Sequence, residues 1–157
     1  MRTPAELTDL FRAHGRKVTP QRQGIFRALQ GHEGHPSAEM VYEVVRAEME
    51  TISLKTVYQT LNDLSELGEI AALDLGTGTL RFDPNVETSH HHLVCRSCGA
   101  VRDVFVDLAG LELPAAHAQG YDVGGAEVVF RGRCGECRRA GPEPAGAATR
   151  IAAAGQR

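Results

Sequence analysis

The sequence predicts an α+β protein, with helices in its first half and mainly short strands in its second. Apolar residues recur at helical spacing up to Leu64, and short apolar segments bounded by turn residues follow. Two Cys-x-x-Cys pairs stand at the ends of predicted strands in the second half. With 157 residues, the chain has room for two small lobes, each with a thin core that a metal ion can help to stabilise.

Four helices are expected: residues 4–14, from Pro20 to Gly31, after Ser37, and from Ser53 onwards. Thr19 can cap the second helix, and Pro20 fits its first turn, where a missing N–H group costs nothing. Apolar residues at the inward positions form a stripe along each helix. They are Leu7, Leu10, Phe11, Ile25, Phe26, Leu29, Val41, Val44, Val45, Leu54, Val57, Leu61 and Leu64.

A hairpin is expected after the helices, with strands at 69–74 and 79–83 joined by the turn Leu75–Gly78. Helices followed by a two-stranded hairpin have the order of a winged helix-turn-helix, which favours DNA binding. The fourth helix also carries polar side chains able to hydrogen-bond bases or phosphates. With the basic residues near the N-terminus, the expected DNA-contacting residues are Arg16, Lys17, Arg22, Lys55, Thr56, Tyr58 and Gln59.

The overall charge does not favour strong general affinity for nucleic acid. The net charge is -3 and the isoelectric point is about 6.2, whereas phosphate binding needs positive potential. The basic residues crowd the first thirty positions and the acidic residues lie mostly in the middle. On charge alone, an ordinary solvated surface explains this distribution better than a DNA-binding face does.

The second half is expected to form a separate lobe. Residues 1–84 form the winged-helix unit, 85–89 a polar hinge, 90–139 the second lobe and 140–157 a disordered tail rich in Ala, Gly and Pro. Within the second lobe we expect strands at 90–94, 100–106 and 126–131 and a helix at 108–118.

The four cysteines, Cys95, Cys98, Cys134 and Cys137, are all the cysteines of the chain. Two Cys-x-x-Cys pairs in a reducing compartment are typical of a tetrahedral zinc site, closed to water and structural in role. The alternatives are four unrelated cysteines or a thioredoxin-like redox pair. No apolar stretch approaches the ~20 residues of a membrane span, and the N-terminus lacks a secretory signal, so we expect a cytoplasmic protein.

Three consecutive histidines precede the first cysteine pair. In an extended segment His90 and His92 share one face while His91 points to the other. His35, Asp83 and Asp103 can join the first two if the lobes fold toward each other. Imidazoles with carboxylates suit Fe²⁺, Mn²⁺, Co²⁺ or Zn²⁺. The alternative is a polar strand end with solvent-exposed rings.

These motifs resemble the ferric uptake regulator (Fur) superfamily over about residues 5–138. The matching segments are His35–Glu39, Ile52–Leu61, His90–Gly99 and Cys134–Cys137. The resemblance implies a homodimeric, metal-dependent transcriptional repressor with an N-terminal winged helix, a hinge and a C-terminal α/β dimerisation domain. It also implies a palindromic operator in double-stranded DNA, with one structural Zn²⁺ and one regulatory Fe²⁺ or Mn²⁺ per subunit.

The PerR-like, peroxide-sensing branch of this superfamily uses three histidines and two aspartates. Its ligand positions correspond to His35, Asp83, His90, His92 and Asp103. Asp103 stands where iron-uptake regulators usually carry glutamate, and Asp83 where zinc-uptake regulators of actinobacterial type tend to have cysteine. The resemblance thus implies control of oxidative-stress genes, with His35 and His90 as the oxidation-sensitive residues.

Two residues depart from the superfamily pattern. Gln59 replaces a frequent arginine, and Ala126 stands where many members have a histidine. Two other functions are considered: a repressor of iron, manganese or zinc uptake, and a mononuclear non-haem iron oxygenase with two histidines and one carboxylate. The wing and recognition helix have no use in an oxygenase, so the sequence favours a regulator and not an enzyme.

Overall fold

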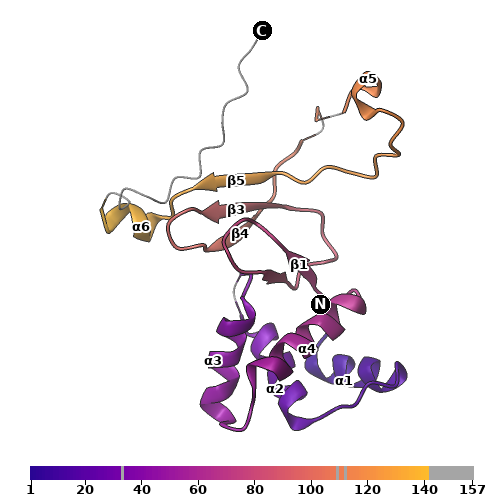
Figure 1. Cartoon of the computed structure of the whole chain (residues 1–157), viewed down its shortest axis with the longest axis vertical. Coiled ribbons are helices and arrows are strands. Elements are labelled where there is room, and N and C mark those ends of the chain that lie inside the picture. The colour runs from indigo at the N-terminus through magenta and orange to yellow at the C-terminus, as the bar shows by residue number, and fades with distance from the viewer. Residues whose placement is uncertain (33, 109, 112, 142–157) are drawn as a thin grey trace.

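The computed structural model describes residues 1–32, 34–108, 110–111 and 113–141. Four helices gather at one end of the molecule, a three-stranded sheet lies toward the other, and a two-stranded hairpin lies between them (Figure 1). This arrangement confirms the predicted α+β fold class. Within the described residues, every helix is too short or too polar to span a bilayer.

The four predicted helices are present, and the second and third begin directly after their predicted capping residues, Thr19 and Ser37. They are α1 (Pro4–Ala13), α2 (Pro20–Gln30), α3 (Ala38–Glu48) and α4 (Leu54–Glu66). Each follows a serine or threonine whose hydroxyl oxygen accepts a hydrogen bond from the backbone N–H three residues later. The capping residues are Thr3, Thr19, Ser37 and Ser53.

The helices enclose one apolar core, in which the rings of Phe11 and Phe26 pack edge to face with centroids 4.9 Å apart. Two predicted core positions were wrong. Val44 is 50% exposed because the buried stripe of α3 runs through Val41 and Val45, and position 44 lies beyond its edge. Leu54 is 36% exposed because it is the first residue of α4, before the helix reaches the core.

The hairpin joins the helical lobe to the second lobe. Strands β1 (Ala71–Leu73) and β2 (Arg81–Asp83) pair antiparallel and are shorter than predicted. The N–H of Phe82 donates to the carbonyl of Pro36 at 2.9 Å, which holds the end of β2 against the loop before α3. His35 and Asp83 thereby become neighbours although 48 positions separate them.

The second lobe is a three-stranded sheet in the order β4-β3-β5. Strand β3 (His91–Cys95) pairs antiparallel with β4 (Val101–Val104) and parallel with β5 (Val129–Gly132). Its small core contains Val94 and Val101 together with Leu75 from the hairpin turn. The two lobes therefore share apolar contacts through the wing.

The predicted helix at 108–118 is wrong in extent. In the described part of this segment only α5 (Ala115–Ala118) is helical, and Pro114 stands at its N-cap. Leu111 and Leu113 are exposed, so no packing against the sheet stabilises helix there. A further short helix, α6 (Gly135–Arg139), was not predicted. The predicted disordered tail lies, from residue 142 on, outside the described residues.

The helical lobe gives a test of which face of α3 is buried. Val41→Ala should lower the free energy of unfolding by about 2 kcal/mol, because it removes two buried methyl groups. Val44→Ala, the matched change on the exposed face, should stay within about 0.5 kcal/mol of the unsubstituted protein. Urea unfolding followed by circular dichroism measures both, and equal losses would show that the assigned face is wrong.

Candidate metal centres

The four cysteines converge at the end of the second lobe. Cys95 ends β3 and Cys98 lies in the turn after it, while Cys134 caps α6 and Cys137 lies within α6. The four sulfur atoms all lie within 4.8 Å of one another, and no disulfide joins any two of them. Four thiols at this spacing fit a tetrahedral zinc site, as the sequence predicts.

Backbone amides prepare this site for negative charge. Burial disfavours the Cys95 thiolate, but amide hydrogen bonds from Cys134, Cys98 and Ser97 outweigh burial and lower its pKa to about 6. Hydrogen bonds with the Cys134 and Cys98 sulfurs raise the pKa of Cys137 to about 12. For Cys98, the Ala100 amide favours the thiolate, yet burial and the contact with Cys95 raise its pKa. Without metal, the cluster therefore keeps protons that zinc must displace.

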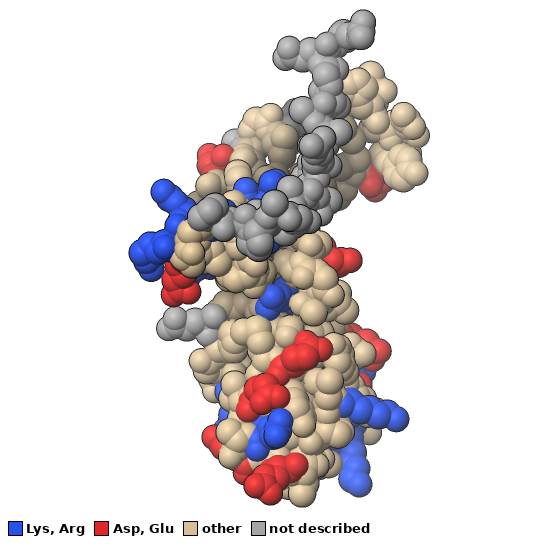
Figure 2. Space-filling model, turned by 60° about the vertical axis from the view of Figure 1, so that its left-hand side comes forward, with Lys and Arg blue, Asp and Glu red and all other residues tan. Residues whose placement is uncertain are grey.

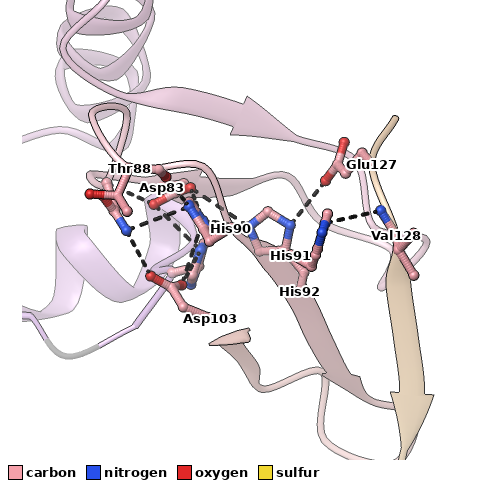
Figure 3. A network of polar contacts seen from close by, with 10 residues as sticks. Asp83, Thr88, His90, His91, His92, Asp103, Glu127 and Val128 are labelled. Carbon is pink, nitrogen blue, oxygen red and sulfur yellow. Dashed lines mark hydrogen bonds and ion pairs between the residues drawn. The ribbon is translucent and has the colours of Figure 1, made fainter. Parts of the chain in front are cut away.

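A second cluster lies between the two lobes, where His35, His90, His92 and Asp103 each offer an atom within 4.8 Å of the others. Asp83 completes it, with Oδ2 2.9 Å from His90 Nε2 and 3.6 Å from His92 Nε2. Figure 3 shows Asp83, His90 and Asp103 directed toward one point. The five residues that the sequence proposes for the regulatory site are thus brought together, two from the helical lobe and its wing and three from the second lobe.

Hydrogen bonds fix which ring nitrogen of two histidines faces this point. His90 Nδ1 lies 2.8 Å from the Thr88 carbonyl, and His92 Nδ1 lies 2.9 Å from the Glu127 carboxylate (Figure 3). Both partners are acceptors, so each Nδ1 carries a proton. The Nε2 atoms of the two rings, 3.2 Å apart, face the carboxylates and are the nitrogens available to bind a metal ion.

The surroundings of His35 indicate whether this cluster is suited to bind a metal ion. Its side chain is almost fully buried, and within the described residues neither ring nitrogen has a hydrogen-bond partner. Its Nε2 nevertheless lies 3.4 Å from Asp83 Oδ1 and 3.1 Å from Asp103 Oδ1. A buried nitrogen without a hydrogen bond, next to two carboxylates, is the arrangement expected of a metal ligand.

The aspartates and histidines of this cluster influence one another's charge. Burial alone would raise the pKa of Asp83, but His35, the Asn85 amide and His90 lower it. For His90, burial alone would lower the pKa, but the Thr88 carbonyl, Asp83 and Asp103 outweigh burial and raise the pKa above its ordinary value. Asp83 thus stays ionised and attracts positive charge to the centre.

Two neighbouring side chains were missed by the sequence analysis. Glu127 orients His92, and Asn85 donates from Nδ2 to Asp103 Oδ2 at 3.1 Å. Only the parallel register that pairs His92 with Val129 brings Glu127 close, and no local pattern signals it. His91 lies outside the cluster, as strand alternation predicts, because its Nδ1 accepts from the Val128 N–H at 3.4 Å.

The proposed DNA-contacting residues differ in their availability. Arg16 and Arg22 both pair with Asp63 on α4, and their side chains are 22% and 13% exposed. Tyr58 donates its hydroxyl to Glu39 at 2.6 Å, and Thr56 is half-buried beside Ser53. The exposed members are Lys17, Lys55 and Gln59. Figure 2 shows acidic and basic side chains interspersed over the helical lobe on the face drawn.

The thiol protonation leads to a prediction for zinc binding. Near pH 7, zinc should displace at least two protons from the reduced, metal-free protein, because the raised pKa values of Cys98 and Cys137 keep both thiols protonated. Calorimetry in buffers of different ionisation enthalpy counts these protons. Zinc affinity should fall with falling pH, and binding without proton release would contradict the assignment.

The contact between Glu127 and His92 leads to a second prediction. Glu127→Ala should weaken Mn²⁺ binding by about 10- to 100-fold, since His92 loses the acceptor that orients its ring. Glu127→Gln retains an acceptor oxygen and should recover part of the loss. The electron paramagnetic resonance signal of free Mn²⁺ measures both. Asp122→Ala, an exposed carboxylate in the same lobe, is the control, and an equal loss there would remove Glu127 from this role.

The chain matches a family model and several known proteins along most of its length. The sequence model of the ferric uptake regulator family matches residues 13–130. The peroxide-responsive repressor PerR of Staphylococcus epidermidis is 33% identical over 132 residues, which cover 83% of this chain and 87% of that protein. Two solved structures, each 28% identical, also match.

The first is a zinc-bound manganese uptake regulator, with a TM-score of 0.68 over 85% of this chain and 99% of the other. The second is the Vibrio cholerae ferric uptake regulator (Fur), with a TM-score of 0.67 over 82% of this chain and 99% of the other. The match to the family model extends from the end of α1 into β5 and so includes both lobes. The chain belongs to the ferric uptake regulator family, whose members are metal-dependent, DNA-binding transcription regulators that act as dimers.

Proposed function

We propose that this protein is a transcriptional repressor that senses peroxide through a regulatory Fe²⁺ or Mn²⁺ ion and controls oxidative-stress genes. The observation that carries the proposal is the buried centre of three imidazoles and two carboxylates, to which both lobes contribute. The ligands of the regulatory metal are His35, Asp83, His90, His92 and Asp103. The 33% identity with a peroxide-responsive repressor supports this branch of the family.

The regulatory ion couples the two lobes in this proposal. His35 and Asp83 belong to the winged-helix unit (residues 1–84), and the other three ligands follow the hinge (85–89) in the dimerisation unit (90–139). We call the arrangement in which the two units lie against each other the closed arrangement. An ion held by ligands from both units stabilises this arrangement, because the ion binds it more tightly than an arrangement in which the units have separated. In a homodimer, the closed arrangement sets the spacing of two α4 helices on a palindromic operator in double-stranded DNA.

The zinc ion has a structural role in this proposal. Cys95, Cys98, Cys134 and Cys137 hold one Zn²⁺ per subunit, and four thiolates leave no position for water. Zn²⁺ then contributes folding free energy to a lobe whose buried apolar cluster, among the described residues, consists of Leu75, Val94 and Val101. A protein of this kind acts in the cytoplasm, where its thiols stay reduced.

The exposed residues Lys17, Lys55 and Gln59 are the leading candidates for DNA contacts, since nothing in the helical lobe covers them. Thr56 and Tyr58 lie on the same helix as Lys55 and complete the proposed reading surface. Arg16 and Arg22 act through Asp63, whose two carboxylate oxygens they hold from the turn before α2 and from α2 itself. These two arginines then fix α4 in its position and leave the exposed residues to contact phosphates and bases.

Peroxide sensing requires a ligand histidine to be oxidised. Bound Fe²⁺ supplies the reactivity toward peroxide that Mn²⁺ lacks. One oxygen atom of peroxide would be added to the imidazole of His35 or His90, a two-electron oxidation of the ring, and the other oxygen atom would leave as water. The oxidised ring would be a poorer ligand, so the two lobes would no longer be held together and the operator would be released.

Mass spectrometry of the iron-loaded dimer after peroxide treatment tests the proposed function. We expect a gain of one oxygen on His35 or His90, loss of operator binding, and neither change in the manganese-loaded dimer. His14→Ala, an exposed histidine on the helical lobe, is a control that should leave both results intact. An iron-loaded protein that remains unmodified and bound to DNA would refute peroxide sensing.

A repressor of metal uptake is the second candidate. The two solved relatives at 28% identity are named for manganese and iron uptake, and they match over most of this chain. In that function the concentration of the metal ion controls operator release, and peroxide leaves the ligands unchanged. The family match favours either regulator over the iron oxygenase considered from the sequence.

A further inference from the structure

A second polar cavity lies between the lobes and contains none of the regulatory ligands. It has a volume of about 460 Å³. Gly76, Thr77 and Arg81 of the hairpin line one side, and the segment Val94–Gly99 and Arg131 of the second lobe line the other. Its walls therefore come from the same two lobes that the regulatory metal connects.

The charged side chains that line this cavity are basic. They are Arg81, Arg96 and Arg131, and no aspartate or glutamate is among the described residues that line it. Arg131 donates a hydrogen bond to the Leu75 carbonyl at 2.6 Å. Among the described residues, no carboxylate forms an ion pair with Arg131. Three guanidinium groups on one cavity form an attractive site for an anion.

Arg81 is the most unusual of the three because it is only 9% exposed. Its Nε is buried without a hydrogen-bond partner, and its Nη1 contacts the weak acceptor Met40 Sδ at 3.2 Å. Within the described chain, no carboxylate forms an ion pair with it. Its charge acts only weakly on the Glu39 carboxyl, whose pKa is lowered mainly by the hydrogen bond from Tyr58 and least by Arg81. A buried cation normally has an ion-pair partner, so this guanidinium is available to a bound anion.

The backbone makes room for Arg81. Gly99 has a φ of +71°, which favours glycine, and a Cβ atom at this position would lie 2.9 Å from Arg81 Nη2. The same Cβ would lie 3.6 Å from Thr77 Cβ across the cavity. A side chain at position 99 would therefore displace the guanidinium from the cavity wall.

We propose that this cavity binds a phosphate group, as inorganic phosphate or as a small phosphate monoester. Guanidinium groups match the oxygen spacing of phosphate and donate paired hydrogen bonds to it. Three of them favour an anion with two charges over a singly charged one, and the volume exceeds that of phosphate alone. Bound phosphate contacts the wing through Arg81 and the second lobe through Arg96 and Arg131, so it favours the closed arrangement. Binding itself does not rest on the peroxide-sensing function.

The zinc-loaded protein must be used in the test, because Cys95 and Cys98 also line the cavity and a zinc tetrathiolate carries negative charge. Calorimetric titrations with inorganic phosphate and with glycerol 3-phosphate, at constant ionic strength in chloride, should each show saturable binding of one ligand per subunit. Tighter binding of inorganic phosphate identifies the free ion as the ligand, and tighter binding of the ester identifies a phosphorylated metabolite.

Substitutions locate the site. Arg81→Gln should weaken binding at least tenfold, and Arg96→Gln, which changes an exposed side chain, tests the same cavity if the buried substitution prevents folding. Arg102→Gln, an exposed arginine of β4 outside the cavity, should leave binding unchanged. Absence of saturable binding with both probes, or equal affinity in all three variants, would overturn the proposal.

Discussion

The structure depends on the convergence of two carboxylates and three imidazoles at the junction of its lobes. The negative charge of Asp83, which is only 3% exposed, is costly to bury unless a cation compensates it. Two backbone features enforce the arrangement. The hydrogen bond from Phe82 to Pro36 holds the end of the wing beside the loop that carries His35, and the β3–β4 register places His92 opposite Asp103. Each lobe therefore positions its own ligands through its backbone pairing, and the relative position of the two lobes is the variable that an ion can control.

The two metal centres divide structural and responsive roles along a single strand. Strand β3 carries His92 near its start and Cys95 at its end, so the rigid cysteine centre lies three residues from a ligand of the regulatory centre. Four thiolates leave no open coordination position at the first centre, whereas the imidazoles and carboxylates of the second suit exchangeable ions. In the proposed function, the cysteine centre holds β3 in place. The free energy of ion binding at the regulatory centre therefore changes the relative position of the lobes and not the conformation of β3.

Much of the fold was predictable because it depends on local chemistry. Capping hydroxyls and Pro20 locate the helix starts, and strand alternation separates His91 from its two neighbours. The cysteine spacing also predicts the convergence of the four thiols, since each pair lies at the end of a strand of one sheet.

The remaining features depend on contacts between distant segments. Glu127 meets His92 only through the parallel pairing of β3 with β5, and Arg81 enters the second cavity only because the wing folds against the cysteine turn. Helix α5 is short because Leu113, just before it, packs against no apolar surface that would stabilise a longer helix. Amino-acid composition does not show whether such a surface is present. Tertiary contacts decide these features, and a single sequence holds no local signal for them.

Anomalous diffraction at the manganese edge, from crystals of the zinc-loaded dimer grown with Mn²⁺, tests most directly the claim that one ion connects both lobes. The account predicts a single manganese peak per subunit in addition to zinc, within bonding distance of His35 and Asp83 on one side. The same peak must lie within bonding distance of His90, His92 and Asp103 on the other. A peak bound only by residues of the second lobe, or none at this junction, would contradict it.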